Sequence, residues 1–160
     1  MMEEILREHF RLKETIVTIS ARKQEHIDAA KTSIAKQRAY LEDFISNDPF
    51  FMITLEPYDL QAKGLPDIVK QMIKSSAAVG VGPMACVAGA IADFALQAMI
   101  NAGATYAIVD NGGDICILND ETVLVGIYAG RSSLQDLAFQ IPLRNRPIGI
   151  CTSSGTVGPS

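Results

Sequence analysis

Apolar side chains recur at helical spacing between residues 24 and 45, beginning with Ile27, Ala30 and Ile34. Residues three, four and seven positions apart lie on one face of a helix, so this stretch predicts an amphipathic helix. We expect the helix to end before Pro49, because proline lacks the backbone N–H group that the next turn needs and restricts the residue before it.

Three further segments of the first half show a pattern. Residues 15–21 are rich in β-branched side chains and predict a strand. Residues 49–57 hold a run of apolar residues between two prolines, and we interpret them as an irregular or short extended segment that fills the core. Residues 65–78 predict a helix with one apolar face and with Pro66 in its first turn.

Residues 84–102 predict a helix of a different kind. The segment is rich in alanine, Asp93 is its only charged residue, and Gly103 ends it. A helix with so few polar positions is expected to be covered on nearly every side.

After Gly103 the apolar runs become short, and tight turns separate them. We expect a meander of three strands followed by two more strands. The expected strands cover residues 105–109, 115–118, 122–128, 136–141 and 147–152. Pro142 and Pro147 are expected to limit the last two, because proline removes a hydrogen-bond donor from a sheet. The fold class that follows is α+β, a mixed or antiparallel sheet packed with helices.

Composition narrows the class of protein. Of the 160 residues, 48% are hydrophobic and 20% are charged, which is typical of a folded chain. We expect a single domain over residues 1–160, with a seam near residues 74–80 where a charged part gives way to an Ala/Gly-rich part. The net charge is −4 and no cluster of lysine and arginine is present, which argues against nucleic acid as a partner.

Location and assembly are also predicted. The three cysteines, Cys86, Cys116 and Cys151, show no C-x-x-C spacing, so reduced thiols in the cytoplasm are expected. The N-terminus has no apolar signal segment, and glycines, Pro83 and Asp93 interrupt the longest apolar stretch, so no membrane partner is expected. The Ala-rich helix needs more cover than this short chain offers, which favours a homo-oligomer.

A glycine-rich loop precedes the Ala-rich helix. Gly82, Pro83, Met84 and Ala85 lie where backbone N–H groups and the helix dipole favour an anion, so a phosphate can dock there. The alternative is that the glycines cap the preceding helix and Pro83 opens the next one. Cys86 follows in the first turn, where a lowered thiol pKa would make it a nucleophile, although a small core residue is the commoner role.

A second motif lies between two expected strands. Asn111, Gly112 and Gly113 form a hairpin signal, because these residue types tolerate the positive φ of a type I′ turn. Asp110 and Asp114 flank the turn, and we expect the two carboxylates to lie close together in apolar surroundings. Such carboxylates are commonly paired, hydrogen-bonded or bound to metal, so Asp114 is a candidate catalytic residue and metal ligand. A third segment, Thr152, Ser153, Ser154 and Gly155, offers hydroxyl groups for phosphate or ribose, or is an ordinary polar loop.

Taken together, these motifs resemble the UPF0280 family, a branch of the ApbE-like superfamily. The resemblance rests on ETIVTISA, the segment at Pro49, GVGPMACVAGAIADFA, VDNGGDICI and GICTSSGTVGPS, in this order. The best-understood members of the superfamily are FAD:protein FMN transferases, which use Mg²⁺ to cleave FAD and pass FMN to a threonine of an acceptor protein. The resemblance implies an ApbE-like fold and a flavin or adenine nucleotide as the ligand. It also implies a further C-terminal segment that this chain lacks.

The resemblance also assigns residues. The family's NGGD corresponds to residues 111–114, its G-P-M-A loop to residues 82–85, and its T-S-G-like strand end to residues 152–155. These are the candidate cofactor contacts. Two alternatives stay open: a sulfur-assimilation or homocysteine-pathway protein that uses Cys86 or Cys151 or acts as a non-catalytic partner, and an interaction protein without catalysis.

Overall fold

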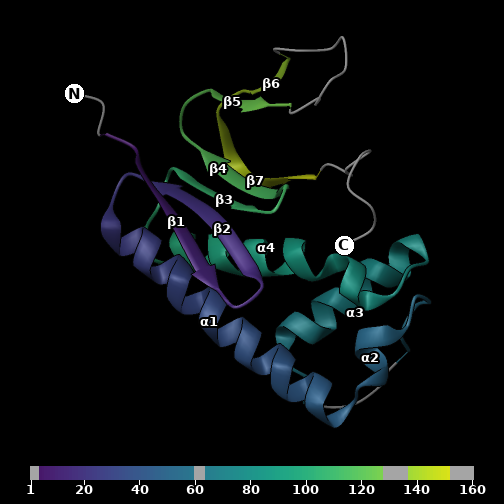
Figure 1. The fold of residues 1–160 in the computed structure, drawn as a ribbon. Helices are drawn as coiled ribbons and strands as arrows, with labels where there is room; N and C mark the ends of the chain where they lie inside the picture. The colour runs from purple at the N-terminus through teal and green to yellow at the C-terminus, as the bar shows by residue number, and fades with distance from the viewer. Residues whose placement is uncertain (1–3, 60–63, 128–136, 152–160) are drawn as a thin grey trace.

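A computed structural model describes residues 4–59, 64–127 and 137–151. A five-stranded antiparallel sheet has the strand order β1-β2-β3-β4-β7, and a two-stranded sheet, β5-β6, lies apart from it. Helices α1, α3 and α4 lie on one side of the large sheet and β5-β6 lies on the other (Figure 1). The elements are β1 Leu6–Leu12, β2 Thr15–Ala21, α1 Gln24–Asn47, α2 Phe50–Ile53, α3 Asp67–Val79, a 3₁₀ turn at Pro83–Cys86, α4 Val87–Asn101, β3 Ala107–Asn111, β4 Asp114–Asn119, β5 Val123–Gly126, β6 Ala138–Ile141 and β7 Arg144–Cys151.

The structure confirms the α+β class and several of the predicted elements. Strand β2 covers the predicted residues, and α1 extends the predicted helix by only two residues, to Asn47. The hydrophobic positions that defined α1, including Ile27, Ala30 and Ile34, are fully buried against the sheet and α4. The helical period therefore marks the face that packs in the core.

Strand β1 was not predicted. Its apolar residues Leu6, Phe10 and Leu12 all lie on the face that packs against the core, whereas the residues that alternate with this face, Arg7, His9 and Arg11, are exposed. Charged residues occupy most of the other positions, which hides the period-two pattern. Strand β1 forms an edge of the large sheet and pairs with β2 alone.

The segment that begins at Pro49 is helical, so the prediction of an irregular or extended segment is wrong. It forms the short helix α2, whose Phe51 is fully buried, whereas Phe50, Met52 and Ile53 are exposed. The Phe51 ring meets the rings of Phe44 and Tyr58 edge-on, with centroids 5.0 and 5.2 Å away. The core-filling role that we expected of the segment therefore falls to one side chain.

The helix starts also differ in detail from the prediction. Pro66 is the N-cap residue of α3 and lies just before its first turn. The Ala-rich helix begins with the 3₁₀ turn, so Cys86 is the N-cap residue of α4 and does not lie within its first turn. Tight 3₁₀ geometry is common at helix starts and lets Pro83 open the helix, because proline needs no N–H partner there.

The predicted three-strand meander is wrong. Strands β3 and β4 form a hairpin as expected, but β5 leaves the large sheet and pairs with β6, and β7 takes the place beside β4. Pro147 lies inside β7, where we expected a strand limit. The register beside it shifts between Ile117 and Asn119, and among the described strands β7 pairs with β4 alone, so the missing donor of Pro147 is tolerated.

The cover of α4 comes from the chain itself. The helix packs against α1, α3, β3 and β4, and its exposed positions Asp93, Gln97 and Asn101 form one polar stripe. Four-residue spacing gathers the few exposed polar side chains of α4 on one face, and the expected homo-oligomer stays a prediction. By length and composition alone, Pro83–Asn101 is long and apolar enough to cross a membrane, contrary to our expectation. A core helix packed between a sheet and other helices has the same composition.

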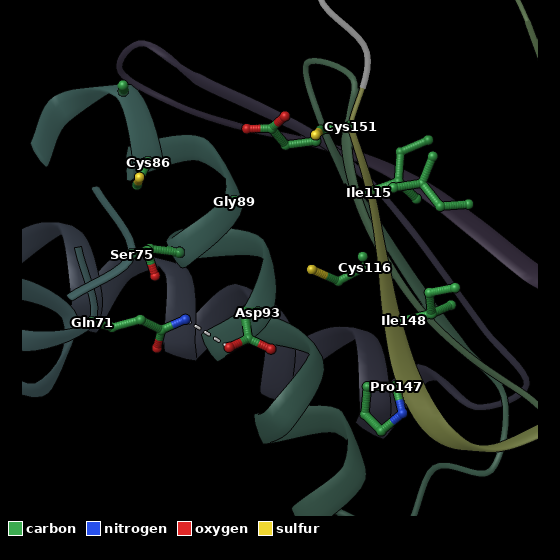
Figure 2. Close-up of a pocket in the computed structure, with 15 residues that line it drawn as sticks. Gln71, Ser75, Cys86, Gly89, Asp93, Ile115, Cys116, Pro147, Ile148 and Cys151 are labelled. Atoms are coloured by element: carbon green, nitrogen blue, oxygen red, sulfur yellow. Dashed lines mark hydrogen bonds between the residues drawn. The ribbon is translucent and has the colours of Figure 1, made fainter. Parts of the chain in front are cut away.

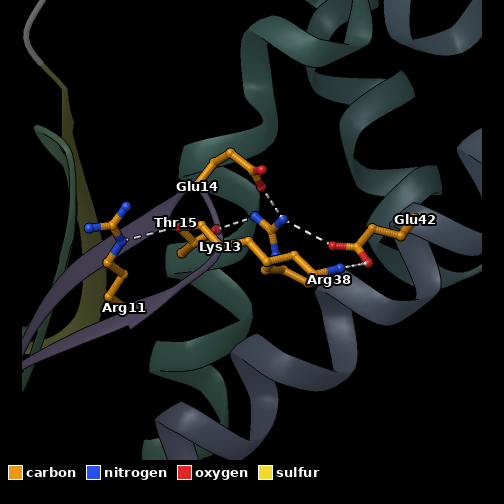
Figure 3. A network of polar contacts seen from close by, with 6 residues as sticks. All are labelled: Arg11, Lys13, Glu14, Thr15, Arg38 and Glu42. Atoms are coloured by element: carbon orange, nitrogen blue, oxygen red, sulfur yellow. Dashed lines mark hydrogen bonds and ion pairs between the residues drawn. The ribbon is translucent and has the colours of Figure 1, made fainter.

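Charged side chains attach the first hairpin to α1. Arg38 of α1 donates to the Thr15 hydroxyl at 2.5 Å and to the Glu14 and Glu42 carboxylates at 2.6 and 3.0 Å (Figure 3). Lys13, in the turn between β1 and β2, pairs with Glu42 at 2.5 Å. The arginine therefore links the turn to the helix over the edge of the sheet.

Candidate functional site

A cleft of about 520 Å³ lies between the α3–α4 side of the molecule and strands β4 and β7 (Figure 2). Two of the predicted motifs contribute to it, through Ala85 of the glycine-rich loop and Asp114 of the hairpin. Cys151, which directly precedes the third motif, lines its rim. Pockets of this size typically hold small-molecule ligands, so we take the cleft as the candidate site.

The cleft is hollow because small residues face it from both walls. Gly89 and Ala90 of α4 face Cys116 of β4 and Gly149 of β7 across the gap. Along β7 the large side chains Ile148 and Ile150 alternate with small residues and pack on the opposite face of the sheet. There they join a second apolar cluster, whose buried members are Tyr106, Ile117, Val123 and Ile141. Alternation along the strand therefore leaves the helix-facing side unfilled.

The hairpin holds the start of α4 through two side chains. Asn111 Nδ2 donates to the Ala88 carbonyl at 3.0 Å, and the nearby Gly89 N–H lowers the pKa of the Asp114 carboxyl group. The Ala88 carbonyl and the Gly89 N–H belong to the same peptide group, and Asn111 and Asp114 are directly opposite in the β3-β4 register. One cross-strand pair thus faces one peptide group at the start of α4. The N-cap residue of α4, Cys86, makes no side-chain hydrogen bond to the helix, and the Asp114 carboxylate lies near this end, where a negative charge is favourable.

Burial raises the pKa of the Asp114 carboxyl group, and repulsion from Asp110 raises it further, while the Gly89 hydrogen bond opposes both effects. A carboxylate that is costly to ionise is stabilised by a nearby cation. Among the described residues of the cleft, Asp114 is therefore the one whose charge a bound cation would stabilise most.

The two carboxylates that flank the turn lie on opposite faces of the sheet, which corrects our expectation that they lie together. Asp114 is paired with Asn111 and faces α4. Asp110, one residue before Asn111, therefore lies on the opposite face of the sheet, where it accepts a hydrogen bond from the Gly113 N–H at 2.9 Å. Gly112 and Gly113 both have positive φ, as a type I′ turn requires. The turn prediction is confirmed, and Asp110 supports the turn.

The glycine-rich loop is shaped mainly by packing. A Cβ atom on Gly82 would lie 2.0 Å from the Thr54 carbonyl oxygen, so only glycine fits where the loop passes α2. Pro83 is buried and has no N–H group, and the Ala85 N–H donates to the Gly82 carbonyl at 3.2 Å. The predicted phosphate loop has two other backbone donors, the N–H groups of Gly82 and Met84. Of its four residues, only Ala85 lines the cleft.

All three cysteines of the chain line the cleft. Cys116 extends from the sheet toward the helices, and Cys86 lies on the helix side of the gap (Figure 2). Burial raises the pKa of the Cys116 thiol to about 12, with contributions from Asp93 and Asp114, and burial followed by Asp114 raises the pKa of Cys86. Both thiols are protonated at neutral pH, so the helix dipole does not activate Cys86 as a nucleophile.

Several residues of the cleft were not singled out in the sequence. Gln71 Nε2 donates to the Asp93 carboxylate at 2.8 Å, and Ser75 lies beside them on α3 (Figure 2). The sequence did carry a signal for Asp93, because it is the only charged residue of the Ala-rich helix. A single carboxylate in such an apolar segment is a candidate for a polar site. Residues 152–155 of the third motif lie outside the described residues.

The donors of the cleft decide what kind of metal ion fits. Among the described residues, no group of three or more histidine, cysteine, aspartate or glutamate side chains is placed to hold a metal ion. Magnesium commonly takes one or two protein carboxylates and completes its shell with water and ligand phosphates. Asp114 fits a magnesium ion shared with a phosphate ligand, and the described residues do not fit a metal ion held by protein side chains alone.

Comparison with known proteins identifies relatives. A family model described as AbpE bacteria matches residues 1–160. The chain is 56% identical to a UPF0280 protein of Methanothrix thermoacetophila over 98% of its length, and 53% identical to one of Methanococcoides burtonii over 97%. A UPF0280 protein of Methanosarcina barkeri is 52% identical over 97% of the chain. The chain spans 66%, 65% and 61% of these three relatives.

The match to the family model covers the whole chain, and more than half of the aligned residues are identical in these relatives. The chain belongs to the UPF0280 family.

Proposed function

We propose that this protein is ApbE-like and binds a flavin or an adenine nucleotide in the cleft. FAD or FMN is the cofactor or substrate class, and Mg²⁺ accompanies its phosphates. The proposal includes an FMN-transferase-type activity toward an acceptor protein in the cytoplasm, in which Asp114 is the candidate catalytic residue.

One observation carries the proposal. Ala85, Asp114 and Cys151 come from three separate parts of the chain, and all of them line one cleft. They mark the glycine-rich loop, the NGGD hairpin and the strand that leads to the third motif, which are the segments that the resemblance assigns to the ligand. A volume of about 520 Å³ is enough for the ring system or the nucleoside part of such a ligand.

The charges of the cleft favour a cation together with the phosphates. Its described lining holds the carboxylates of Asp93 and Asp114 and no lysine or arginine side chain. A bare pyrophosphate would be repelled there, whereas a magnesium-bound one would relieve the costly charge of Asp114. When bound, the ion supplies charge stabilisation for the phosphates. The chain's own residues position the ligand: Asn111 and Asp114 hold the wall of the cleft, and the small residues leave room for a flat ring.

Transfer to an acceptor would follow from this arrangement. A threonine hydroxyl oxygen of the acceptor would form a bond to the phosphorus of the FMN half of FAD. The bond from that phosphorus to the AMP half would break, AMP would leave, and the hydroxyl proton would pass to water or a base. The cleft is open along β7, whose residues Pro147, Gly149 and Cys151 are exposed, so a partner chain has access.

Isothermal titration calorimetry with FAD, FMN and ADP, each with and without MgCl₂, tests the proposal. We expect FAD to bind, and to bind at least about tenfold more tightly with magnesium. Asp114→Asn keeps the size of the side chain and should remove the magnesium effect. Asp110→Asn is the matched control, because it changes the same hairpin on the opposite face of the sheet.

Two results would overturn the proposal. No heat from any of the three ligands at millimolar concentration would exclude a nucleotide site in this chain and favour an interaction protein without catalysis. Equal loss of binding in the Asp114 and Asp110 variants would show that the hairpin fold, and not the Asp114 charge, matters for the ligand.

The three cysteines favour sulfur handling as a second candidate function. Cys86, Cys116 and Cys151 face one space, and Cys151 is the exposed one. In this function a persulfide donor R–S–SH would transfer its outer sulfur to Cys151, which would leave R–SH and a protein persulfide. Such chemistry fits a protein of the sulfur-assimilation or homocysteine pathway, or a partner of one.

Alkylation rates separate the two candidates. Iodoacetamide at neutral pH followed by peptide mass spectrometry should modify Cys151 first, then Cys86, and Cys116 last, because burial raises the pKa of the latter two thiols. Sulfur handling predicts that Cys151 reacts faster than a thiol of the urea-unfolded chain and gains one sulfur from a persulfide donor. A Cys151 that reacts no faster than the unfolded chain and gains no sulfur would exclude it.

A further inference from the structure

A second cavity lies on the opposite face of the large sheet, beneath strand β5. It has a volume of about 560 Å³ and is lined by residues of β1, β2, β3, β4 and β5. The helices cover the other face of the sheet, so this outer cavity is separate from the cleft (Figure 1). It has no part in the proposed nucleotide site.

The strand register arranges its floor as two rows. In the first row Arg7, Ser20 and Ile108 are neighbours across β1, β2 and β3, and in the second row Thr18 lies beside Asp110. Polar and charged groups therefore occupy the β1–β2 side. Ile115 of β4 and Val123 and Val125 of β5 line the cavity on the other side, next to the second apolar cluster.

Two hydroxyl groups on the floor have no partner. Ser20 is 9% exposed and Tyr106 is 6% exposed, and the hydroxyl groups of both make no hydrogen bond within the part of the chain that the structure describes. Neither hydroxyl oxygen is among the fully buried unpartnered polar atoms of the described residues, so both oxygens are open to the cavity. A polar ligand there can therefore reach them.

The charges at the cavity are mixed. Glu121 is paired with Arg22 at 3.4 Å, and Asp110 uses one hydrogen bond to support the turn. Arg7 is exposed, and within residues 4–59, 64–127 and 137–151 it forms no ion pair. A ligand with only one charge would leave either Arg7 or Asp110 unmatched. A ligand with both charges matches the two rows, one to each.

We propose that the outer cavity binds a small zwitterion with an apolar side chain, that is, a free aliphatic α-amino acid. Its carboxylate lies at Arg7 and the Ser20 hydroxyl, and its ammonium group lies at Asp110, next to the Thr18 hydroxyl, which is hydrogen-bonded to His9 Nδ1 at 3.0 Å. Its side chain lies over Ile115 and beneath Val123. Tyr106 supplies a further hydroxyl at the floor. This inference does not depend on the proposed nucleotide function.

Methyl NMR of the isoleucine-, leucine- and valine-labelled chain tests the inference with three related probes. L-Leucine carries both charges, 4-methylpentanoate lacks the ammonium group, and 3-methylbutylamine lacks the carboxylate. We expect L-leucine to shift the methyl signals of Ile108, Ile115 and Val123 saturably, and the other two probes to bind at least about tenfold more weakly, because each loses a charged hydrogen bond.

Matched variants locate the charges. Arg7→Gln and Asp110→Asn should each weaken L-leucine binding by about tenfold. Arg11→Gln should leave it unchanged, because Arg11 is on the same strand and the same face as Arg7 but does not line the cavity. The proposal is overturned if L-leucine gives no saturable shift, if 4-methylpentanoate binds as well as L-leucine, or if the Arg11 variant weakens binding as much as the Arg7 variant. The probe series on the unchanged chain keeps the test decisive even if a variant fails to fold.

Discussion

At the scale of single residues, Asp114 serves the fold and the candidate site together. Its carboxylate lies beside Gly89 at the start of α4, and the same group lines the cleft. A Cβ atom at position 89 would lie 3.7 Å from that carboxylate, which is an ordinary van der Waals distance. A substitution at Asp114 therefore changes both the attachment of the hairpin and the charge of the cleft, and the pH dependence separates the two effects.

The stability of the protein should depend on the ionisation of Asp114. Because burial raises its folded-state pKa above the ordinary value of 3.8, this group stabilises the fold below pH 3.8, and that contribution is lost as the pH rises through the raised pKa. Asp114→Asn removes this loss. Urea unfolding at a series of pH values should show the variant gaining free energy of unfolding relative to the unchanged chain across that window, with no further gain above it. A difference that is constant with pH would contradict the assignment.

Gly82 should tolerate no side chain. The Cβ atom of Gly82→Ala would lie 2.0 Å from the Thr54 carbonyl oxygen, so the loop or α2 must shift. We expect a loss of about 1–3 kcal/mol in the free energy of unfolding, measured by urea denaturation. Gly126→Ala is the control, because nothing lies within 4 Å of its Cβ position, and its effect should stay within about 0.5 kcal/mol. Equal effects of the two substitutions would show that the close approach is not what requires glycine at residue 82.

Part of the candidate site could be predicted from the sequence, and part could not. Ala85 and Asp114 were singled out because the glycine-rich loop and the hairpin signal are local patterns. Gln71 and Cys116 were not, because their place in the cleft depends on how α3 and β4 pack around α4, which no local pattern records. The sequence also suggested that Asp110 and Asp114 lie together, because they are close along the chain. Alternation along the strands instead places their side chains on opposite faces of the sheet.

At the scale of elements, Arg38 attaches the β1–β2 hairpin to α1 (Figure 3). Its side chain is 14% exposed and reaches Thr15, which is buried. Arg38→Met keeps most of the packing of the stem and removes these contacts. We expect a loss of about 1.5–3 kcal/mol in the free energy of unfolding, since hydrogen bonds to charged groups contribute that much.

Lys13→Met is the matched control for Arg38→Met. Lys13 pairs with the same carboxylate, that of Glu42, but its side chain is 56% exposed, so water screens the pair. Its substitution should change the free energy of unfolding by less than about 1 kcal/mol. If the two variants lose equal stability in urea denaturation, the buried hydrogen bond to Thr15 is not the main contribution of Arg38.

The elements themselves were predicted where periodicity is strong and missed where pairing is not local. Helix α1 followed from its apolar spacing, and the β3-β4 hairpin followed from its turn residues. The position of β5 could not be predicted in this way, because long-range packing decides whether β5 or β7 pairs with β4. Strand β1 was missed although its alternation was present, because charged residues between Leu6 and Phe10 resembled a surface segment.

At the scale of the whole molecule, assembly remains a prediction. Among the described strands, β7 lies at an edge of the large sheet and has mostly exposed residues, and Leu124, Phe139 and Leu143 are exposed apolar residues around β5-β6. Open edges and apolar patches favour pairing with another chain. We expect a homodimer or larger oligomer by light scattering at micromolar concentration. A monodisperse species of 17.2 kDa would contradict this expectation.

The strand order has a consequence for how the protein folds. Strand β2 lies between β1 and β3, yet all four α-helices separate β2 from β3 along the chain. During synthesis the first hairpin and α1 therefore emerge from the ribosome well before the strand that completes their sheet. Contacts between residues distant in sequence slow folding, because a long loop must close before they form. The half-built sheet is expected to keep an open edge along β2 for this interval. The Arg38 contacts join elements that are near in sequence, so we expect them to form before β3 arrives.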